Sequence, residues 1–411
     1  MPADRARLAA YNAVKRIDSG AYSNLISVFD RLSGVDRAFA ESIALGTAER
    51  MRTLEYVCRG FYRSEVKRET ELLLFCGVYQ LLFMDKIPDN AACDETVRIG
   101  AELFGRGVAG FINAVMRSVC REREAVYARI NSAPRDIFYS ADSGLYSLIE
   151  GQYGKDTTER IFASFMGGHE CFVRVNGMRS DSEKVASMLD GKAVSETRVV
   201  CRNARKAVEM LETGDYIIQG PGSQSAVELL SAARGERIVD VCACPGGKTL
   251  GAAIDMHGKG EIYAFDIHEN KLPLILAGAK RLGIDCIRAA KRDARTAEPA
   301  LVGSADGVIC DVPCSGTGVI GTKPEIKYKS PKDFSRLYAV QRDILLSAVS
   351  YLKSGGRLVY STCSINKCEN EDIVLSLTER SRDYTLVSQR TYLPFENGGE
   401  GFYTALIKKE R

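Results

Sequence analysis

The first third of the chain repeats apolar residues at the spacing of an amphipathic helix. Leu8, Tyr11 and Val14 recur every three to four residues and would share one helix face. The same spacing, without any alternating strand pattern, predicts further helices near 22–32, 36–60, 66–85, 91–103 and 107–123. The run Asn-Ser-Ala-Pro at 131–134 then breaks the periodicity. Residues 1–128 are therefore expected to form an all-α domain that folds by itself.

The pattern changes twice more along the chain. Residues 135–225 mix short helices with strand-like pieces such as Cys171–Asn176, which predicts a small α+β connecting region. Over residues 226–411, apolar β-branched runs alternate with helical stretches. The strands expected there are 237–241, 261–265, 285–289, 306–310 and 356–361. This alternation is typical of an α/β, Rossmann-like domain with a doubly wound parallel sheet.

Composition and charge exclude several classes of protein. The longest apolar run, Leu72–Met84, is too short to span a membrane and contains Gln80, so it predicts a buried core helix. Charges interrupt every apolar run near the amino terminus, which argues against a signal peptide.

Thirteen cysteines without a secretion signal indicate reduced thiols, and we expect a cytoplasmic protein. Three histidines and no Cys-x-x-Cys pair argue against a metal site. The net charge of +3 is too small to establish nucleic-acid binding.

A glycine turn follows the strand expected at 237–241. Its end, Gly247-Lys248-Thr249, resembles the end of a phosphate-binding loop. That loop needs a glycine where Cys242 stands, and Pro245 removes a backbone N–H group that a phosphate would use. An ATPase is therefore disfavoured. Taken alone, the turn fits an ordinary strand-to-helix connection as well as a ligand site.

Three aspartates, Asp266, Asp293 and Asp311, each follow an expected strand. Because the carboxyl ends of parallel strands share one edge, we expect these acids to line one crevice. An acid about 20 residues after a glycine turn is placed to accept hydrogen bonds from ribose hydroxyls. Any one of them is more often a loop acid or a helix cap. The three together disfavour a triphosphate and favour a neutral or cationic nucleoside such as S-adenosylmethionine.

Two cysteines supply candidate chemistry at the same edge. Cys314 and Cys363 each follow an expected strand, in loops of Pro, Ser, Thr and Gly. Methylation of carbon 5 of a pyrimidine needs a thiolate, because thiolate addition at carbon 6 makes carbon 5 nucleophilic. Asp311 lies three residues before Cys314 and can stabilise charge on the pyrimidine. The spacing does not decide which cysteine attacks.

The segments DVCACPGGKT (240–249), DVPCSGTG (311–318) and YSTCSINKCENE (360–371) resemble successive motifs of the RNA cytosine-5 methyltransferases of the Nol/Nop/Sun class. The resemblance implies that Cys363 is the nucleophile and that Cys314 helps release the product. Enzymes that methylate cytosine in DNA use the proline-cysteine position as nucleophile, so both cysteines together imply RNA. The resemblance to the RNA methyltransferases also implies which residues hold S-adenosylmethionine. These are Cys242, Ala243, Cys244, Pro245, Gly246, Gly247, Lys248, Asp266, Asp293 and Asp311.

The amino-terminal region resembles the NusB-like domain of the bacterial Sun (Fmu) proteins, which methylate a cytosine of small-subunit ribosomal RNA. Segments 36–50 and 78–97 are examples. The resemblance implies a 16S rRNA cytosine-5 methyltransferase whose 1–128 domain binds RNA or protein and whose 135–225 region binds RNA. We expect a monomer acting on an unpaired cytosine. A tRNA cytosine-5 methyltransferase and a catalytically vestigial RNA-binding assembly factor are the alternatives.

Several positions depart from the family pattern. Gly220-Pro221-Gly222 replaces an acidic, alanine-containing run, and Cys368 follows Lys367 where proline and glutamate are frequent. Lys323 and Tyr328 stand where histidine and tryptophan are usual. None of these changes removes a catalytic group.

The sequence around Tyr328 predicts that Lys323, Lys327 and Lys329 hold the RNA backbone while the tyrosine ring stacks a base. The alternative is a solvated basic loop.

Overall fold

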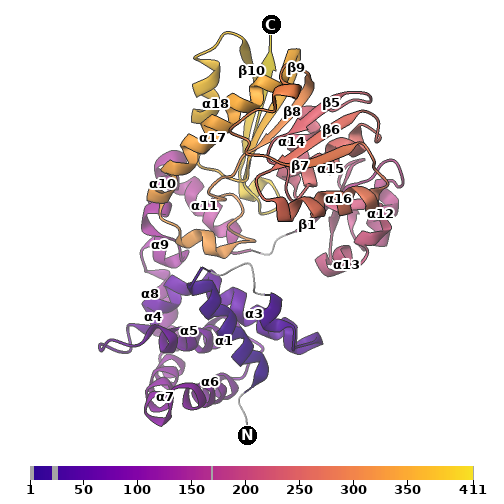
Figure 1. The fold of residues 1–411 in the computed structure, drawn as a ribbon. Coiled ribbons are helices and arrows are strands. Elements are labelled where there is room, and N and C mark those ends of the chain that lie inside the picture. Colours follow the sequence, from indigo (N-terminus) through magenta and orange to yellow (C-terminus); the bar gives the residue numbers. More distant parts are fainter. Residues whose placement is uncertain (1–3, 21–25, 168–169, 411) are drawn as a thin grey trace. The chain divides into compact units, whose positions relative to one another are not determined.

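The computed structural model describes residues 4–20, 26–167 and 170–410 (Figure 1). They form two compact units. The first extends to Leu148 and also includes Lys327–Lys329, and the second contains 149–326 and 330–411. The division into regions 1–128, 135–225 and 226–411 remains a prediction. A short segment from late in the sequence thus belongs to the amino-terminal unit.

The first unit is helical, as its periodicity predicts. Its elements are α1 (Arg5–Asp18), α2 (Ile26–Phe29), α3 (Gly34–Glu49), α4 (Met51–Cys58), α5 (Arg68–Phe83), α6 (Asp89–Phe104), α7 (Arg106–Arg121), α8 (Arg123–Asn131) and α9 (Arg135–Phe138). Of the helix predicted near 22–32, only α2 is seen, and residues 21–25 lie outside the described residues. Helix α10 (Ser143–Tyr153) crosses the boundary between the units.

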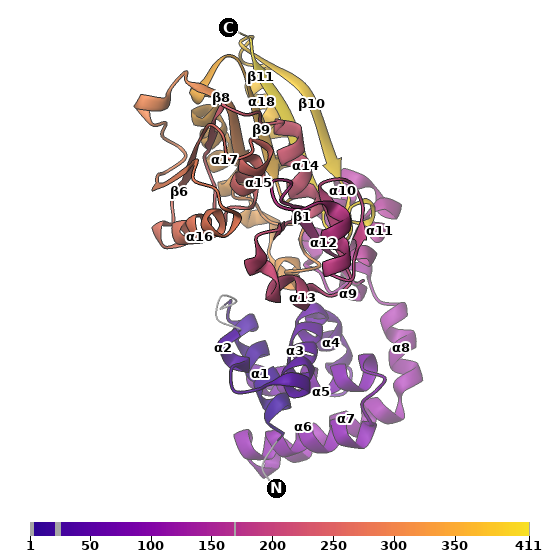
Figure 2. The ribbon, with the colours of Figure 1, turned by 90° about the vertical axis from the view of Figure 1, so that its right-hand side faces the viewer.

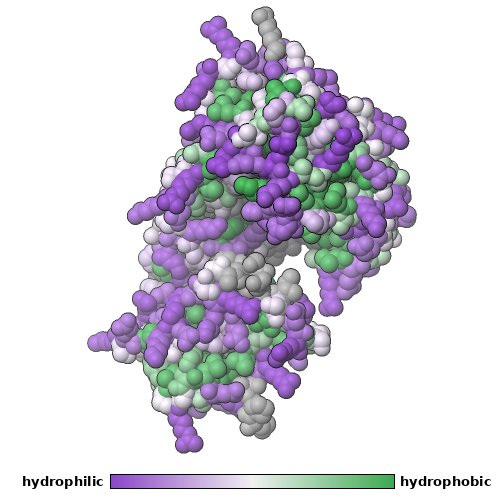
Figure 3. Space-filling view, viewed as in Figure 1, coloured by the Kyte–Doolittle hydropathy of each residue, from purple (hydrophilic) through white to green (hydrophobic). Residues whose placement is uncertain are grey.

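Helix α5 is the core helix predicted from the apolar run. It contacts α1, α3, α4, α6 and α7 and is buried over most of its length. Its buried Gln80 is paired: the side chain accepts from Arg7 Nε at 2.8 Å and donates to the Cys76 carbonyl at 2.9 Å. In the part of the chain that is described, no helix is long and apolar enough to cross a membrane. Polar side chains cover most of the larger unit's face in Figure 3.

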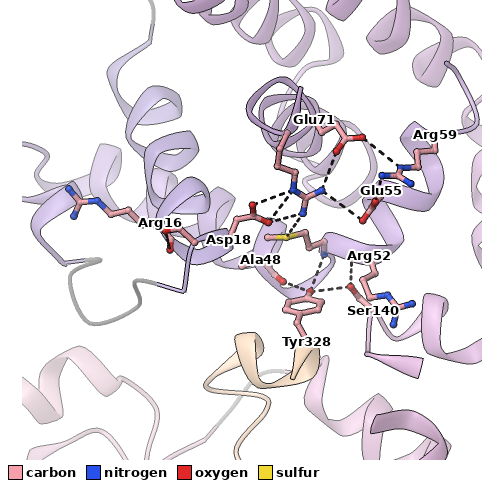
Figure 4. Close-up of polar contacts among 12 residues, drawn as sticks. Arg16, Asp18, Ala48, Arg52, Glu55, Arg59, Glu71, Ser140 and Tyr328 are labelled. Atoms are coloured by element: carbon pink, nitrogen blue, oxygen red, sulfur yellow. Dashed lines mark hydrogen bonds and ion pairs between the residues drawn. The ribbon is translucent and has the colours of Figure 1, made fainter. Parts of the chain in front are cut away.

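Tyr328 caps the break between α3 and α4 (Figure 4). Its hydroxyl donates to the Ala48 carbonyl at 2.5 Å and accepts from the Met51 amide at 3.2 Å. Ser140 Oγ lies 3.1 Å from the same hydroxyl. One side chain therefore satisfies a terminal carbonyl of one helix and the first amide of the next.

The neighbouring Lys327 is buried in the same unit, and burial lowers its pKa to about 8. Its ammonium lies 3.4 Å from the Glu49 carbonyl at the end of α3. The prediction that Lys327 holds RNA and that the Tyr328 ring stacks a base is therefore wrong, because the ring also packs on the helical core. Lys323 and Lys329 are exposed, so the prediction stands for them.

The second unit begins with α11 (Lys155–Phe165) and a small antiparallel sheet. Its order is β2-β3-β1-β4, where β1 is Cys171–Val175, β2 Lys192–Ala193, β3 Arg198–Cys201 and β4 Tyr216–Ile218. Helices α12 (Ser182–Met188) and α13 (Ala204–Glu209) accompany it. The strand-like piece read at 171–176 is confirmed as β1.

A seven-stranded sheet of order β10-β11-β9-β8-β5-β6-β7 forms the rest of the unit (Figure 2). The five predicted strands are confirmed as parallel neighbours: β5 (Arg237–Asp240), β6 (Glu261–Asp266), β7 (Ile287–Lys291), β8 (Ala305–Asp311) and β9 (Leu352–Thr362). Two strands were not predicted: β11 (Phe402–Lys409) pairs antiparallel with β9, and β10 (Tyr384–Tyr392) pairs antiparallel with β11. The sheet is therefore mixed and not wholly parallel.

Helices cover both faces of this sheet, as the doubly wound prediction requires. One core contains Ile238 of β5 with α14 (Pro221–Leu230), α15 (Gly247–Asp255) and α16 (Leu272–Leu282). The other contains Val239, the next residue of β5, with α17 (Ser335–Ala348) and α18 (Glu371–Thr378). The strand order reverses between β5 and β8, and ligands of such sheets bind beyond the carboxyl ends of the strands at that point.

Candidate active site

The glycine turn joins β5 to α15 in a tightly held conformation. Gly246 has φ of 115°, a value that residues with a Cβ rarely adopt. The Ala243 amide donates to the Phe265 carbonyl of β6 at 2.8 Å. The Gln219 side chain donates to the Gly247 carbonyl at 3.0 Å. These bonds fix the turn at the edge of the sheet where the predicted acids lie.

A cavity of about 400 Å³ opens at this edge. It is lined by seven of the predicted site residues, namely Cys242, Cys244, Asp266, Asp293, Asp311, Cys314 and Cys363. The lining also includes side chains that sequence reasoning missed: Ile267, His268, Lys271, Arg292, Arg295 and Ile344. The other predicted turn residues, Ala243, Pro245, Gly246, Gly247 and Lys248, shape the turn or contact its neighbours. The volume lies in the range of small-molecule pockets, about 300–1,000 Å³.

The three acids have different partners. Asp266 accepts from the Cys244 amide at 3.1 Å and from the His268 amide at 2.9 Å, so its carboxylate is held in one orientation. Asp293 is half-exposed and pairs with Arg295 at 2.5 Å, and hydrogen bonds from this arginine lower the pKa of the carboxyl. Asp311 pairs with Lys248.

Lys248 links the glycine turn to the strand that leads to Cys314. Its ammonium lies 2.6 Å from one carboxylate oxygen of Asp311, and the Ser361 hydroxyl donates to the other at 2.7 Å. The pair is largely shielded from water, since 12% of the lysine and 29% of the aspartate side chain are exposed. The pair therefore places one positive and one negative group beside the two cysteines.

The sulfur atoms of Cys314 and Cys363 are 3.3 Å apart. A hydrogen bond from Cys314 lowers the pKa of Cys363 against the opposing effect of burial, and the charges of Lys248 and Lys323 lower it further. The same bond and burial raise the pKa of Cys314 well above its ordinary value. The directions of both shifts favour a thiolate at Cys363 over one at Cys314.

Asp240 was not predicted as a site residue, because it falls inside the strand expected at 237–241. It is fully buried, accepts from Thr249 Oγ1 at 2.6 Å, and burial raises its pKa to about 7. The folded protein thus keeps this proton at pH values where the unfolded chain has lost it. The stability that this proton contributes is complete below the ordinary value of 3.8 and is lost as pH rises to about 7.

We therefore expect Asp240→Asn to gain thermal stability relative to the unchanged protein as pH rises from 4 to 7. The gain should approach about 4 kcal/mol, because three pKa units correspond to that free energy. Melting temperatures of both proteins across this range measure it, with the exposed Asp285→Asn as control. A difference that does not depend on pH would contradict the assignment.

Comparisons with known proteins identify the family of this chain. The model for 16S rRNA methyltransferase RsmB/F matches residues 227–408, and the NusB family model matches residues 4–121. A probable ribosomal RNA small subunit methyltransferase B of Bacillus subtilis is 31% identical, with 97% of each chain covered. The chain belongs to the RsmB family. The family's enzyme from Escherichia coli is 27% identical, with 98% of each chain covered.

Solved structures show the same fold. The crystal structure of PH0851 superposes with a TM-score of 0.80 over 98% of both chains, at 24% identity. NSun6 from Pyrococcus horikoshii, solved with the S-adenosylmethionine analogue SFG, gives 0.58 over 66% of this chain and 98% of its own, at 19% identity. As a member of the RsmB family, the chain is an S-adenosylmethionine-dependent 16S rRNA cytosine-5 methyltransferase with an amino-terminal NusB domain. This confirms the activity, cofactor and substrate expected from the motifs.

Proposed function

We propose that Cys363 attacks carbon 6 of the target cytosine, that Cys314 assists release of the product, and that Asp311 with Lys248 contacts the base. The observation that carries this assignment is the 3.3 Å sulfur pair in one cavity with Asp311. Lys248 and Lys323 lower the pKa of Cys363, whereas Glu369 and Asp311 raise that of Cys314. The electrostatics thus support the ranking that spacing alone left open.

The residues of the cavity fit S-adenosylmethionine, which supplies the methyl group when bound. The cavity has the size of a nucleoside ligand and an apolar side formed by Ile267 and Ile344. Asp266 offers fixed carboxylate oxygens, and we propose that they accept hydrogen bonds from the ribose hydroxyls. Asp293 and the Cys242–Lys248 turn complete the proposed cofactor site.

Asp266→Ala is expected to weaken S-adenosylmethionine binding by about 1–3 kcal/mol, because bound hydroxyls would lose their acceptor. Calorimetry measures the affinity. Asp285→Ala is the matched control, since Asp285 precedes β7 and lies outside the cavity lining. ATP titrated in place of the cofactor should give no binding. Micromolar ATP binding, without a response to S-adenosylmethionine, would contradict the proposal.

We propose further that the target cytosine is unpaired. Carbon 6 can reach the Cys363 sulfur, and carbon 5 the methyl group, only if the base enters the cavity, and extrusion of a base costs least from unpaired RNA. Lys323 and Lys329 are exposed and are proposed to contact the backbone. The 1–128 and 135–225 regions are proposed to position the RNA. We propose that the protein acts as a monomer in the cytoplasm.

An RNA fragment with the target cytosine in a loop should be methylated at least about tenfold faster than the same strand in a perfect duplex, because the duplex must also be unpaired. Incorporation of a labelled methyl group at one enzyme concentration measures both rates. A duplex lengthened outside the target controls for binding of double-stranded RNA. Equal rates on the paired and unpaired cytosine would contradict the proposal.

A further inference from the structure

A buried carboxylate joins the two cysteine loops. Glu369 follows β9 in the segment that leads into α18, and it is 0% exposed. Its Oε1 accepts from the Ser315 amide at 2.7 Å, directly after Cys314. Its Oε2 accepts from the Ser315 hydroxyl at 2.5 Å and from the Ser364 hydroxyl at 2.7 Å, directly after Cys363. One side chain thus binds the residue that follows each cysteine.

This carboxylate is held by neutral donors. Gln341 of α17 adds a bond to Oε1 at 3.0 Å, and Asn366 lies 3.5 Å from Oε2. Within the described ranges, no lysine or arginine forms an ion pair with Glu369. A buried carboxylate is costly unless its hydrogen bonds are complete, so the donors must keep their positions. The donors therefore fix the geometry of both loops around one anion.

The charge of Glu369 also disfavours a thiolate at Cys314. It raises the pKa of Cys314, and Lys248 and Lys323 lower that of Cys363. Asp311 raises the pKa of both cysteines and so does not separate them. The charged groups that face the pair are thus Asp311, Glu369, Lys248 and Lys323. The anion Glu369 disfavours a thiolate at Cys314, and the two lysines favour one at Cys363.

We propose that Glu369 is a positioning residue that holds the two cysteine loops together and, through its charge, disfavours a thiolate at Cys314. The proposal rests on the roles of the cysteines given above. It assigns to Glu369 a function that does not require contact with RNA or cofactor. A glutamine at this position would keep the size of the side chain, and the serine hydroxyls can reorient to accept from its amide. Glu369→Gln therefore removes the charge and preserves the packing.

The test measures which cysteine reacts with iodoacetamide in the RNA-free enzyme. At low conversion, peptide mass spectrometry gives the ratio of labelled Cys314 to labelled Cys363. We expect this ratio to rise about tenfold in Glu369→Gln, equivalent to one pKa unit. Covalent adduct formation with RNA should slow in the same variant. Glu371→Gln is the matched control, because Glu371 binds Thr391 at 3.0 Å and contacts neither cysteine loop in the described bonds. Its labelling ratio should not change.

An unchanged ratio in a folded Glu369→Gln protein would overturn the proposal. If that variant does not fold, Ser315→Ala tests the positioning role. It removes one hydroxyl bonded to Glu369 and retains the charge, so adduct formation should slow several-fold while the labelling ratio stays constant. Unchanged adduct formation in Ser315→Ala would also overturn the proposal. If adduct chemistry instead points to Cys314 as nucleophile, the assigned cysteine roles fail, and the labelling ratio still reports on the effect of the charge.

Discussion

Cys363→Ala should reduce methylation of 16S rRNA to less than about a thousandth of the unchanged rate and should form no covalent complex with RNA. In the proposed mechanism the thiolate of Cys363 adds to carbon 6 of the cytosine, and the electrons of the ring then make carbon 5 nucleophilic. Without this sulfur the first bond cannot form, so no later step follows. Labelled methyl incorporation and a denaturing gel of protein with RNA measure the two effects.

Cys368→Ala is the matched control for this experiment. Cys368 lies in the same motif, five residues later, and does not line the cavity. The control should retain activity and adduct formation. Activity close to normal in Cys363→Ala would show that this cysteine is structural and would contradict its role as nucleophile.

Cys314→Ala should accumulate an RNA–protein adduct that survives denaturing electrophoresis. After the methyl group has been transferred to carbon 5, the proton on that carbon must leave, and the bond between carbon 6 and the Cys363 sulfur must break. The Cys314 sulfur is 3.3 Å from that of Cys363, so it lies beside the bond that breaks. Its loss should therefore slow release more than addition, and the adduct should build up to a large fraction of the enzyme.

The double variant Cys314→Ala, Cys363→Ala is the control for the trapped species. It should form no adduct, because the attacking sulfur is absent. The opposite pattern, with an adduct in Cys363→Ala and none in Cys314→Ala, would reverse the two roles. The electrostatics oppose that reversal, since the cations Lys248 and Lys323 favour the thiolate at Cys363.

The amino-acid sequence by itself determined much of this protein. Helical periodicity located α1 and α5 to α7, predicted one helix where α3 and α4 form, and missed α8; strand-length apolar runs located β5 to β9. Both patterns are local, since they depend on residues within one or two turns or a few strand positions. The carboxyl ends of parallel strands share one edge of a sheet, so the sequence predicted that Asp266, Asp293, Asp311, Cys314 and Cys363 lie together. The structure brings all five to one cavity. The motifs, read as a resemblance, indicated the activity that the comparisons confirm.

Only the tertiary structure decided the pairings between distant segments. The edge strand β10 is largely exposed and lacks a buried apolar run, so its membership in the sheet depends on pairing with β11. Tyr328 caps α3 at Ala48, 280 residues away in the sequence, and no local pattern signals that contact. Glu369 reads as an acid near the start of a helix, yet it binds Ser315, 54 residues earlier. Hydrogen bonds of this kind depend on which distant segments of the chain pack against each other. The local spacing of residues does not determine that packing.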